Sequence, residues 1–190
     1  MNNYEAVWLD DKSNVDLGFV VRGTSRRPGL PATVDRTLTI LGRHGQYDFG
    51  AELDARSFVL DCAFVTRNAT ELQQKIRELS RFMVDSYGRP RTLKLRFRER
   101  PGQHFNVRWT GGFDIERIIG TGLFSLTFTA FDPFAYGPEQ VFETTITQSP
   151  FTFEIQSAGD IRTPPVIVLT NIGTTTLNQI RIVNEYLLEE

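Results

Sequence analysis

The chain has 190 residues, 40% of them hydrophobic, which is enough to fill the core of one large or two small domains. Its net charge of -2 and its pI near 5.8 argue against a general nucleic-acid-binding protein, whose pI would lie above about 9. A single cysteine, Cys62, excludes a small scaffold held together by intramolecular disulfides.

The N-terminus and the hydropathy of the chain bear on where the protein is made. Residues 1–8 lack the basic and apolar regions of a signal peptide, and no apolar run approaches the roughly 18 residues that cross a bilayer. We therefore expect a soluble protein that is made in the cytoplasm and is not inserted in a membrane.

Arginine is strongly preferred to lysine, with 18 arginines against 3 lysines, and the chain has 15 phenylalanines. Arginine and aromatic residues are enriched at protein interfaces, where the planar guanidinium forms paired hydrogen bonds and stacks on rings. A GC-rich genome would produce the same arginine bias. The two explanations carry equal weight at this point.

The first third of the chain alternates strand patterns with turns. The patterns predict strands at residues 4–9, 15–22 and 33–41. A polar turn at residues 10–14 and a loop rich in proline and glycine at residues 23–31 connect them. In the last of these strands Val34, Leu38 and Ile40 share one face with Arg36. An arginine among apolar residues is tolerable near the end of a strand.

A more apolar run at residues 56–65 predicts a central strand covered on both faces, with Asp61 as the exception. An amphipathic helix is predicted at about residues 69–87. Asn68 or Thr70 supplies its N-cap, and an acid or amide three residues later completes a capping box. Glycine and proline at 88 and 90 end it.

A β-hairpin with one basic face is predicted after the helix, from strands at residues 93–98 and 104–109. From residue 89 to residue 108, seven positive and one negative side chain give +6, in a chain whose net charge is -2. We predict that the outward row is an interface whose acidic partner comes from a neighbouring subunit or another protein of the same assembly, and its members are Lys94, Arg96, Arg98, Arg100 and Arg108. The alternative is an ordinary solvated sheet face.

The most informative stretch is a long alternating strand from residue 123, in which Phe124, Leu126 and Phe128 share one face. A strand at residues 113–119 feeds it through a turn rich in glycine. Proline after Asp132 then stops it, because proline has no N–H for the ladder. The first domain is therefore predicted to end near residue 137, at a junction formed by Asp132, Pro133, Phe134 and Tyr136.

Residues 138–190 are predicted to form a second, partial domain. Short β patterns with little charge recur between regular turns, at residues 140–147, 151–157, 165–171 and 177–184. They are typical of the opening of a β-sandwich. Such a remnant leaves an apolar face and strand edges open. Three arrangements remain possible: a truncated chain, packing on the first domain, or completion of the sheet by a neighbouring subunit.

No catalytic or cofactor-binding pattern is present. His44 and His104 have no spaced partner for a metal site, and Cys62 lies on an apolar strand face, where a thiol is expected to be buried and unreactive. The glycine-rich residues 42–50 lack the lysine of a phosphate-binding loop. We therefore predict that the protein is not an enzyme and has no metal or cofactor.

Two motifs stand out: Asp-Pro-Phe-Ala-Tyr-Gly at residues 132–137, and Gly-Arg-His-Gly-Gln-Tyr-Asp-Phe-Gly at residues 42–50, followed by a strand and a helix. Together with the order of elements over residues 4–137, they resemble the distal tail protein (Dit) family of long-tailed, non-contractile bacteriophages, the siphophages. The resemblance implies a mainly β fold with one α-helix. In that fold an N-terminal split β-barrel or sandwich, residues 1–137, precedes a partial, galectin-like β-sandwich, residues 138–190.

The same resemblance implies a structural role in the virion. Its members form a ring, taken here as a hexamer, between the tail tube protein and the tail-tip protein. The ring is the baseplate hub of the host-adsorption apparatus, so the protein would be located at the virion tail tip. Relatives carry a complete galectin-like domain, and this chain spans about half of one, which puts glycan binding in doubt.

Two functions of other classes remain open. A carbohydrate-binding module for host cell-wall glycans would use the C-terminal part, although its few aromatic residues fit strand cores. A nucleic-acid-binding β-protein would use the basic hairpin, although we expect no sequence-specific contact with nucleic acid. A ring in solution would favour the structural role over both.

Overall fold

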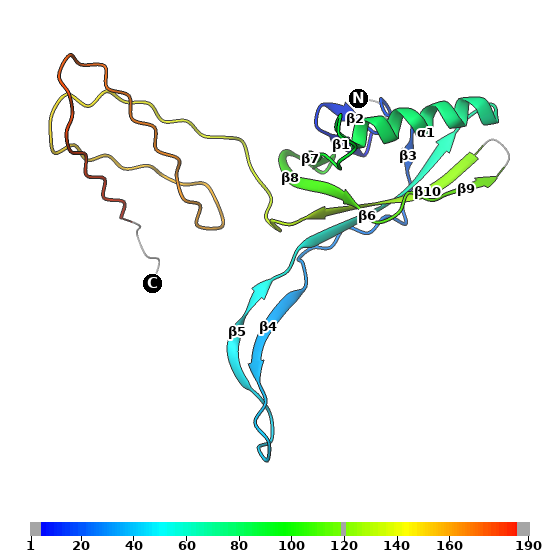
Figure 1. The fold of residues 1–190 in the computed structure, drawn as a ribbon, viewed down its shortest axis with the longest axis horizontal. Helices are drawn as coiled ribbons and strands as arrows, with labels where there is room; N and C mark the ends of the chain where they lie inside the picture. The colour runs from blue at the N-terminus through cyan, green and yellow to red at the C-terminus, as the bar shows by residue number, and fades with distance from the viewer. Residues whose placement is uncertain (1–4, 119–120, 186–190) are drawn as a thin grey trace. The chain divides into compact units, whose positions relative to one another are not determined.

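The structure is a computed structural model that describes residues 5–118 and 121–185 (Figure 1). The chain divides into two compact units, within residues 1–144 and 145–190. The sequence analysis placed a domain boundary at residues 137–138. In the part of the chain that is described, every helix and strand belongs to the first unit.

Within the described residues, the first unit is built on one antiparallel sheet of eight strands, ordered β2-β1-β7-β8-β10-β6-β3, with β9 paired to the end of β10. The sheet curls into an open half-barrel (Figure 1). The predicted mainly β class with one helix is therefore confirmed. The strand bounds are Val7–Leu9 (β1), Lys12–Ser13 (β2), Val20–Val21 (β3), Arg56–Val65 (β6), Thr92–Phe97 (β7), Arg100–Thr110 (β8), Ile115–Ile118 (β9) and Thr121–Ala130 (β10).

The longest pairing joins β6 to β10, in ten consecutive residue pairs from Arg56 opposite Ala130 to Val65 opposite Thr121. The predicted faces are confirmed, because alternate side chains of both strands are buried. Phe64 on β6 stacks on Phe124 on β10, with ring centroids 4.5 Å apart. Such ring pairs add about 0.5–1.5 kcal/mol to the energy of burial. These two strands are the centre of the core.

Asp61, the polar exception in β6, is held by hydrogen bonds. Ser125 Oγ on β10 donates to its carboxylate at 2.7 Å. Hydrogen bonds from Thr24 and then from Ser125 lower the pKa of Asp61, and the positive charges of Arg22 and Arg26 lower it further. The carboxylate therefore remains ionised within an otherwise apolar strand.

The helix α1 spans Ala69–Met83 and lies over one face of the curled sheet (Figure 1). Asn68 is its N-cap, with the side-chain oxygen accepting from the Glu71 amide at 2.9 Å. The helix ends about four residues earlier than the predicted residue 87. Val84 is already extended and forms a bridge to Pro90, so the backbone turns back toward β7 before Gly88.

The strand predicted at residues 15–22 is reduced to the two residues of β3. Asp16 accepts from the Ser13 amide at 2.9 Å and from the Ser13 hydroxyl at 2.8 Å. These bonds lower the pKa of Asp16. They close a turn where the alternation pattern predicted a strand, because short polar side chains offer the backbone a local partner.

A separate two-stranded sheet, which we call the arm, runs from residue 33 to residue 53 and extends away from the main sheet (Figure 1). It consists of β4 (Thr33–Leu38) and β5 (Tyr47–Leu53), and every residue in both strands is exposed. The strand predicted at residues 33–41 is present but ends at Leu38. It pairs only with β5, a strand that the sequence analysis did not predict.

The four strands predicted beyond residue 138 do not form in residues 131–185. Apolar side chains in this segment remain exposed, and that of Val166 is 91% exposed. A strand exists only when another backbone accepts its hydrogen bonds, so an alternating pattern alone does not make one. The described residues 138–185 therefore contain no regular strand, and the partial sandwich stays a prediction.

Hydrogen bonds of the buried Asn14 side chain stabilise the conformation of the N-terminal turn. Its oxygen accepts from the Ala6 amide at 2.8 Å, and its Nδ2 donates to the Phe19 carbonyl at 2.9 Å. Asn14→Ala should lower the free energy of unfolding by about 1–3 kcal/mol, because both backbone groups lose a buried partner. Chemical denaturation measures the change. The exposed Gln103→Ala is the control, and an equal effect of the two substitutions would contradict this role.

Candidate interaction surfaces

The predicted basic row lies on the wet face of β7 and β8, opposite the buried Leu93, Leu95 and Phe97. Register places Lys94 opposite Asn106 and Arg108 opposite Thr92, so both strands contribute to one surface. Arg96 is half-buried. The other four members of the row are exposed, namely Lys94, Arg98, Arg100 and Arg108. The structure thus brings Lys94, Arg96 and Arg108 together on one face, whereas Arg100 pairs with the buried Phe97 and acts on Arg56 at the base of the arm.

Two acidic residues of the same chain partly neutralise this row. Asp10 lies in the turn between β1 and β2 with φ 54°, and its carboxylate accepts from the Lys94 amide at 2.8 Å. Arg91 forms an ion pair with Asp10 at 3.4 Å, and Arg96 approaches Asp11 at 4.0 Å. The sequence predicts only a polar turn at residues 10–14, and the acidic partner was expected from a neighbouring subunit or a tail-tip protein. Part of that role belongs to the chain itself.

The junction residues pack against the end of this surface. Tyr136 and His104 exchange two backbone hydrogen bonds, of 2.9 and 2.8 Å, and their rings stack at 5.7 Å. The Tyr136 hydroxyl donates to the Asp132 carboxylate, and this bond raises the pKa of Tyr136. The Arg108 guanidinium lies over the Phe131 ring, 4.6 Å from its centroid. The predicted junction is therefore an ordered strap on β8.

His104 lies in the positive field of the basic row. Burial, then Lys94, then Arg96 lower its pKa, so the imidazole is neutral at pH 7. A neutral ring stacks on Tyr136 without adding another charge to the row. The histidine therefore has a structural role in the strap.

The base of the arm is held by Arg56, the first residue of β6. Its Nη2 donates to the carbonyls of Pro28, at 2.6 Å, and Gly29, at 2.7 Å, where the chain enters the arm. The guanidinium lies 4.8 Å from the centroid of the Phe105 ring. Burial lowers the pKa of Arg56, and repulsion by Arg100 lowers it further. One side chain thus connects the incoming chain, the outgoing chain and the core.

Arg27, also at the base of the arm, links it to the turn after β7. Its guanidinium forms an ion pair with Glu99 at 2.9 Å and lies 4.5 Å from the centroid of the Phe97 ring. An exposed ion pair of this kind is worth at most about 1 kcal/mol. The ion pair mainly orients the Arg27 side chain, because the ring contact and the ion pair hold the same guanidinium.

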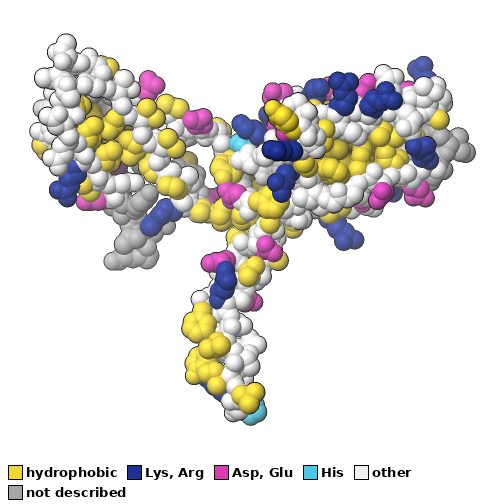
Figure 2. All heavy atoms as spheres, viewed as in Figure 1, with side chains coloured by type: hydrophobic (Ala, Val, Ile, Leu, Met, Phe, Trp, Pro, Cys, Tyr) yellow, Lys and Arg dark blue, Asp and Glu magenta, His cyan; other side chains and the backbone are white. Residues whose placement is uncertain are grey.

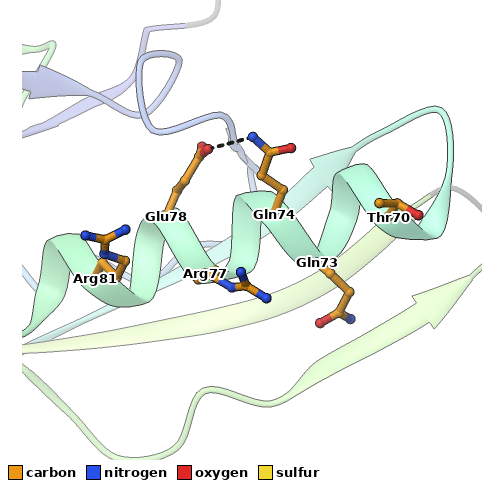
Figure 3. A pocket seen from close by; sticks show the side chains of 6 residues that line it. All are labelled: Thr70, Gln73, Gln74, Arg77, Glu78 and Arg81. Carbon is orange, nitrogen blue, oxygen red and sulfur yellow. Dashed lines mark hydrogen bonds between the residues drawn. The ribbon is translucent and has the colours of Figure 1, made fainter.

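A shallow hollow follows the outer face of α1 (Figure 3) and is lined by Thr70, Gln73, Gln74, Arg77, Glu78 and Arg81. Gln74 donates to Glu78 at 3.1 Å across one helical turn. All six lining residues come from a single helix, so a small molecule would be contacted from one side only. Enclosed sites bury most of a ligand's surface, and this hollow does not provide that.

The described residues give no support to metal or thiol chemistry. No group of three or more His, Cys, Asp or Glu converges among residues 5–118 and 121–185. Cys62 is fully buried, and burial raises the pKa of its thiol. The predicted buried, unreactive cysteine is therefore confirmed. Within the same residues, no helix has the length and apolar character to cross a membrane.

A model of the phage tail protein RIFT-related domain family matches residues 15–130 of the chain. The chain belongs to this family. The matched segment contains the arm, the helix and the basic row and ends with β10, just before the junction strap. The predicted resemblance to siphophage tail proteins is confirmed at the level of the family.

The fold is also similar to a solved structure, the SPP1 Dit (gp 19.1) protein, described as a paradigm of the hub adsorption apparatus in Gram-positive infecting phages. The TM-score is 0.60 with 21% sequence identity, over 70% of this chain and 52% of that protein. The chain thus spans about half the length of the Dit protein that it matches. Comparison with curated proteins gives no match.

Sequence reasoning placed the basic row and the junction but missed the arm as a surface. The signal was present in β5, where Tyr47, Phe49, Ala51 and Leu53 alternate with polar residues or glycine. The glycine-rich residues 42–50 were instead interpreted as a family motif that lacks the lysine of a phosphate-binding loop. In the sequence, the sign that β4 pairs with β5 is limited to two alternating runs that are joined by a glycine-containing loop.

Asp10→Asn combined with Asp11→Asn should raise the salt concentration at which the protein elutes from heparin. Removing both carboxylates leaves Arg91 and Arg96 without their acidic neighbours, and asparagine tolerates the positive φ of Asp10. The control is Asp35→Asn with Asp48→Asn on the arm, which changes the net charge equally. Identical elution of the two variants would show that Asp10 and Asp11 do not mask the row.

Proposed function

We propose that this chain is a structural, non-enzymatic subunit of a phage tail that forms a closed ring, a hexamer, at the tail tip. The ring would join the tail tube protein on one side to the tail-tip protein on the other. The observation that carries the proposal is the family match over residues 15–130, which covers most of the first unit. The virion tail is the corresponding location.

The surfaces of the first unit support association with other proteins. The arm exposes apolar residues on a rigid base, and the basic row keeps charge beyond the part that Asp10 and Asp11 neutralise. Head-to-tail interfaces between identical subunits close into a ring when the rotation per subunit divides a full turn. Two different exposed surfaces on one chain meet the requirement for such an interface.

Carbohydrate binding through the second unit gains no support. Phe142, Phe151 and Phe153 are exposed, as a glycan platform requires, but so are the aliphatic side chains around them. Val166 is 91% exposed and Val168 is 81% exposed. Exposure throughout the segment does not single out the aromatic residues, so the glycan hypothesis remains the weaker one.

Ring formation is tested by native mass spectrometry of the purified chain over a range of concentrations, with negative-stain electron microscopy of the largest species. We expect one closed species of six subunits and ring-shaped particles, because a closed ring satisfies all of its interfaces at once. A monomer at every concentration, together with the absence of this protein from a ring in isolated tails, would overturn the proposal.

Lys94→Glu combined with Arg98→Glu should shift the distribution from ring to monomer, because reversed charges oppose the acidic surface expected on the neighbour. Arg96 is left unchanged, since it donates to the Asp10 carbonyl and supports the fold. Arg67→Glu with Arg77→Glu on the exposed face near and on α1 is the control with the same change in charge. An unchanged ring would mean that the row is a solvated face.

A further inference from the structure

The solvent face of β1, β7 and β8 carries an aromatic side chain among the members of the basic row. Trp8 lies directly opposite Arg96 in the pairing of β1 with β7, so both side chains leave the sheet on the same face. Val7 and Leu9, on either side of Trp8, are fully buried in the core. Trp8 itself is half-buried. A tryptophan is thus held on the face opposite the core, next to a cation.

A line of side chains continues from Trp8 across the sheet to the junction strap. Burial and then the charges of Lys94 and Arg96 lower the pKa of His104, so the imidazole lies near both cations. The backbone of His104 is paired with that of Tyr136, and the two side chains stack with ring centroids 5.7 Å apart. Neighbouring strands lie about 4.8 Å apart, so the line from Trp8 to Tyr136 spans about 14 Å.

Phe131 adds a further exposed aromatic side chain to this face. The Arg108 guanidinium lies over it, 4.6 Å from its centroid, and Arg108 is opposite Thr92 in the pairing of β8 with β7. Phe131 is 59% exposed and Tyr136 is 39% exposed. Figure 2 shows basic and hydrophobic side chains beside one another around the start of β8. Aromatic side chains that are exposed and held in place mark an interaction site rather than an ordinary solvated face.

Cations and aromatic side chains together match one class of ligand. A polyanion without bases, such as polyphosphate, is bound by cations alone, and a nucleic-acid duplex keeps the faces of its bases stacked inside. A single strand presents both charged phosphates and free base faces. Antiparallel sheets bind single strands in this way, with aromatic side chains that stack on two or three bases. The line from Trp8 to Tyr136 has an aromatic side chain at each end and cations between them.

Two acids reduce the positive charge at one edge of this face. Asp10 forms an ion pair with Arg91 at 3.4 Å, and Asp11 approaches Arg96 at 4.0 Å. Lys94 and Arg108 are exposed on the same face. Because the net charge of the whole chain is -2, the attraction for phosphate is local to this face. We therefore expect a modest affinity that falls steeply with salt.

We propose that this face binds single-stranded nucleic acid without sequence preference. The phosphates are contacted by three cations, Lys94, Arg96 and Arg108. The bases stack on three aromatic side chains, Trp8, Phe131 and Tyr136. The proposal goes beyond the assembly of a closed ring and does not depend on it. Lys94 is also changed in the test of assembly given above, whereas Arg108 and the three aromatic residues are not, so substitutions at Arg108 and Phe131 separate the two roles.

Binding is tested by fluorescence anisotropy with the full chain and a labelled oligo(dT) strand. We expect oligo(dT) and a strand of mixed sequence to bind equally, and the duplex of the mixed strand to bind at least about tenfold more weakly. Equal binding of the duplex, or equal competition by polyphosphate, would show that charge alone acts and would overturn the proposal. So would the absence of binding in a preparation that forms the closed ring, which would leave the proposed function intact. Binding by a chain that stays monomeric would support the proposal and count against the ring.

The fluorescence of Trp8 reports base stacking directly. The chain has two tryptophans, and the other, Trp109, packs against the core, so Trp109→Phe leaves Trp8 as the only indole. Circular dichroism checks that this variant is folded. Saturating oligo(dT) should quench the Trp8 emission, because a stacked base contacts the indole. An abasic strand of the same length has the phosphates without the bases and should leave the emission unchanged. Unaltered emission at saturation with oligo(dT) would overturn the proposal.

Two substitutions at exposed positions separate stacking from charge. Phe131→Ala should weaken binding of oligo(dT) about fivefold or more, through the loss of one stacked base. Arg108→Gln should lower the slope of log affinity against log salt by about 0.7, the value of one phosphate contact on a single strand. The controls are Tyr87→Ala and Arg89→Gln, because Tyr87 is exposed and the Arg89 guanidinium lies 5.9 Å from its ring centroid, in the turn after α1. Equal losses in the two pairs of variants would contradict the proposal.

Discussion

The antiparallel pairing of β6 with β10 is the interaction on which the other features depend. It joins ten residues from the middle of the chain to ten near the end of the first unit, and it carries the largest buried rings. The arm enters β6 at Arg56, and the junction leaves β10 after Ala130, which is paired with Arg56. One end of one ladder therefore positions both the arm and the junction strap. The large buried side chains of the core hold that end of the ladder in place.

The first unit carries a basic row whose charge is partly balanced within the monomer and whose exposed side chains stay available for contacts in an assembly. The turn between β1 and β2 brings Asp10 and Asp11 to the basic row, at the cost of a positive φ at Asp10. The half-buried Arg91 and Arg96 lie beside these acids, and the exposed Arg108 lies over the Phe131 ring. Lys94 is exposed in the monomer. Solvated charges that are ordered on a sheet can steer encounters without stabilising the fold.

Alternation along the chain was enough to predict β6, β7, β8 and β10, because these strands are half-buried or buried and their side chains sort by solvent exposure. It could not distinguish β4, which alternates as regularly but pairs outside the core, since alternation reports two faces and not what covers them. In the described residues 138–185 the same pattern forms no ladder. The close spacing of basic residues is visible in the sequence, whereas the approach of Asp11 to Arg96 is a tertiary contact.

The shared end of the β6–β10 ladder also determines how the subunit responds to force. A pull that enters through the arm and leaves through the junction separates Arg56 from Ala130 first, because both lie at the same end. Antiparallel hydrogen bonds lie across the strands, so the ladder opens like a zipper, one pair at a time. The contact of the Arg56 guanidinium with the Phe105 ring on β8 opposes that first opening step, because it ties the start of β6 to the core. Arg56 thus resists separation of the strands at the point where the subunit is weakest under tension.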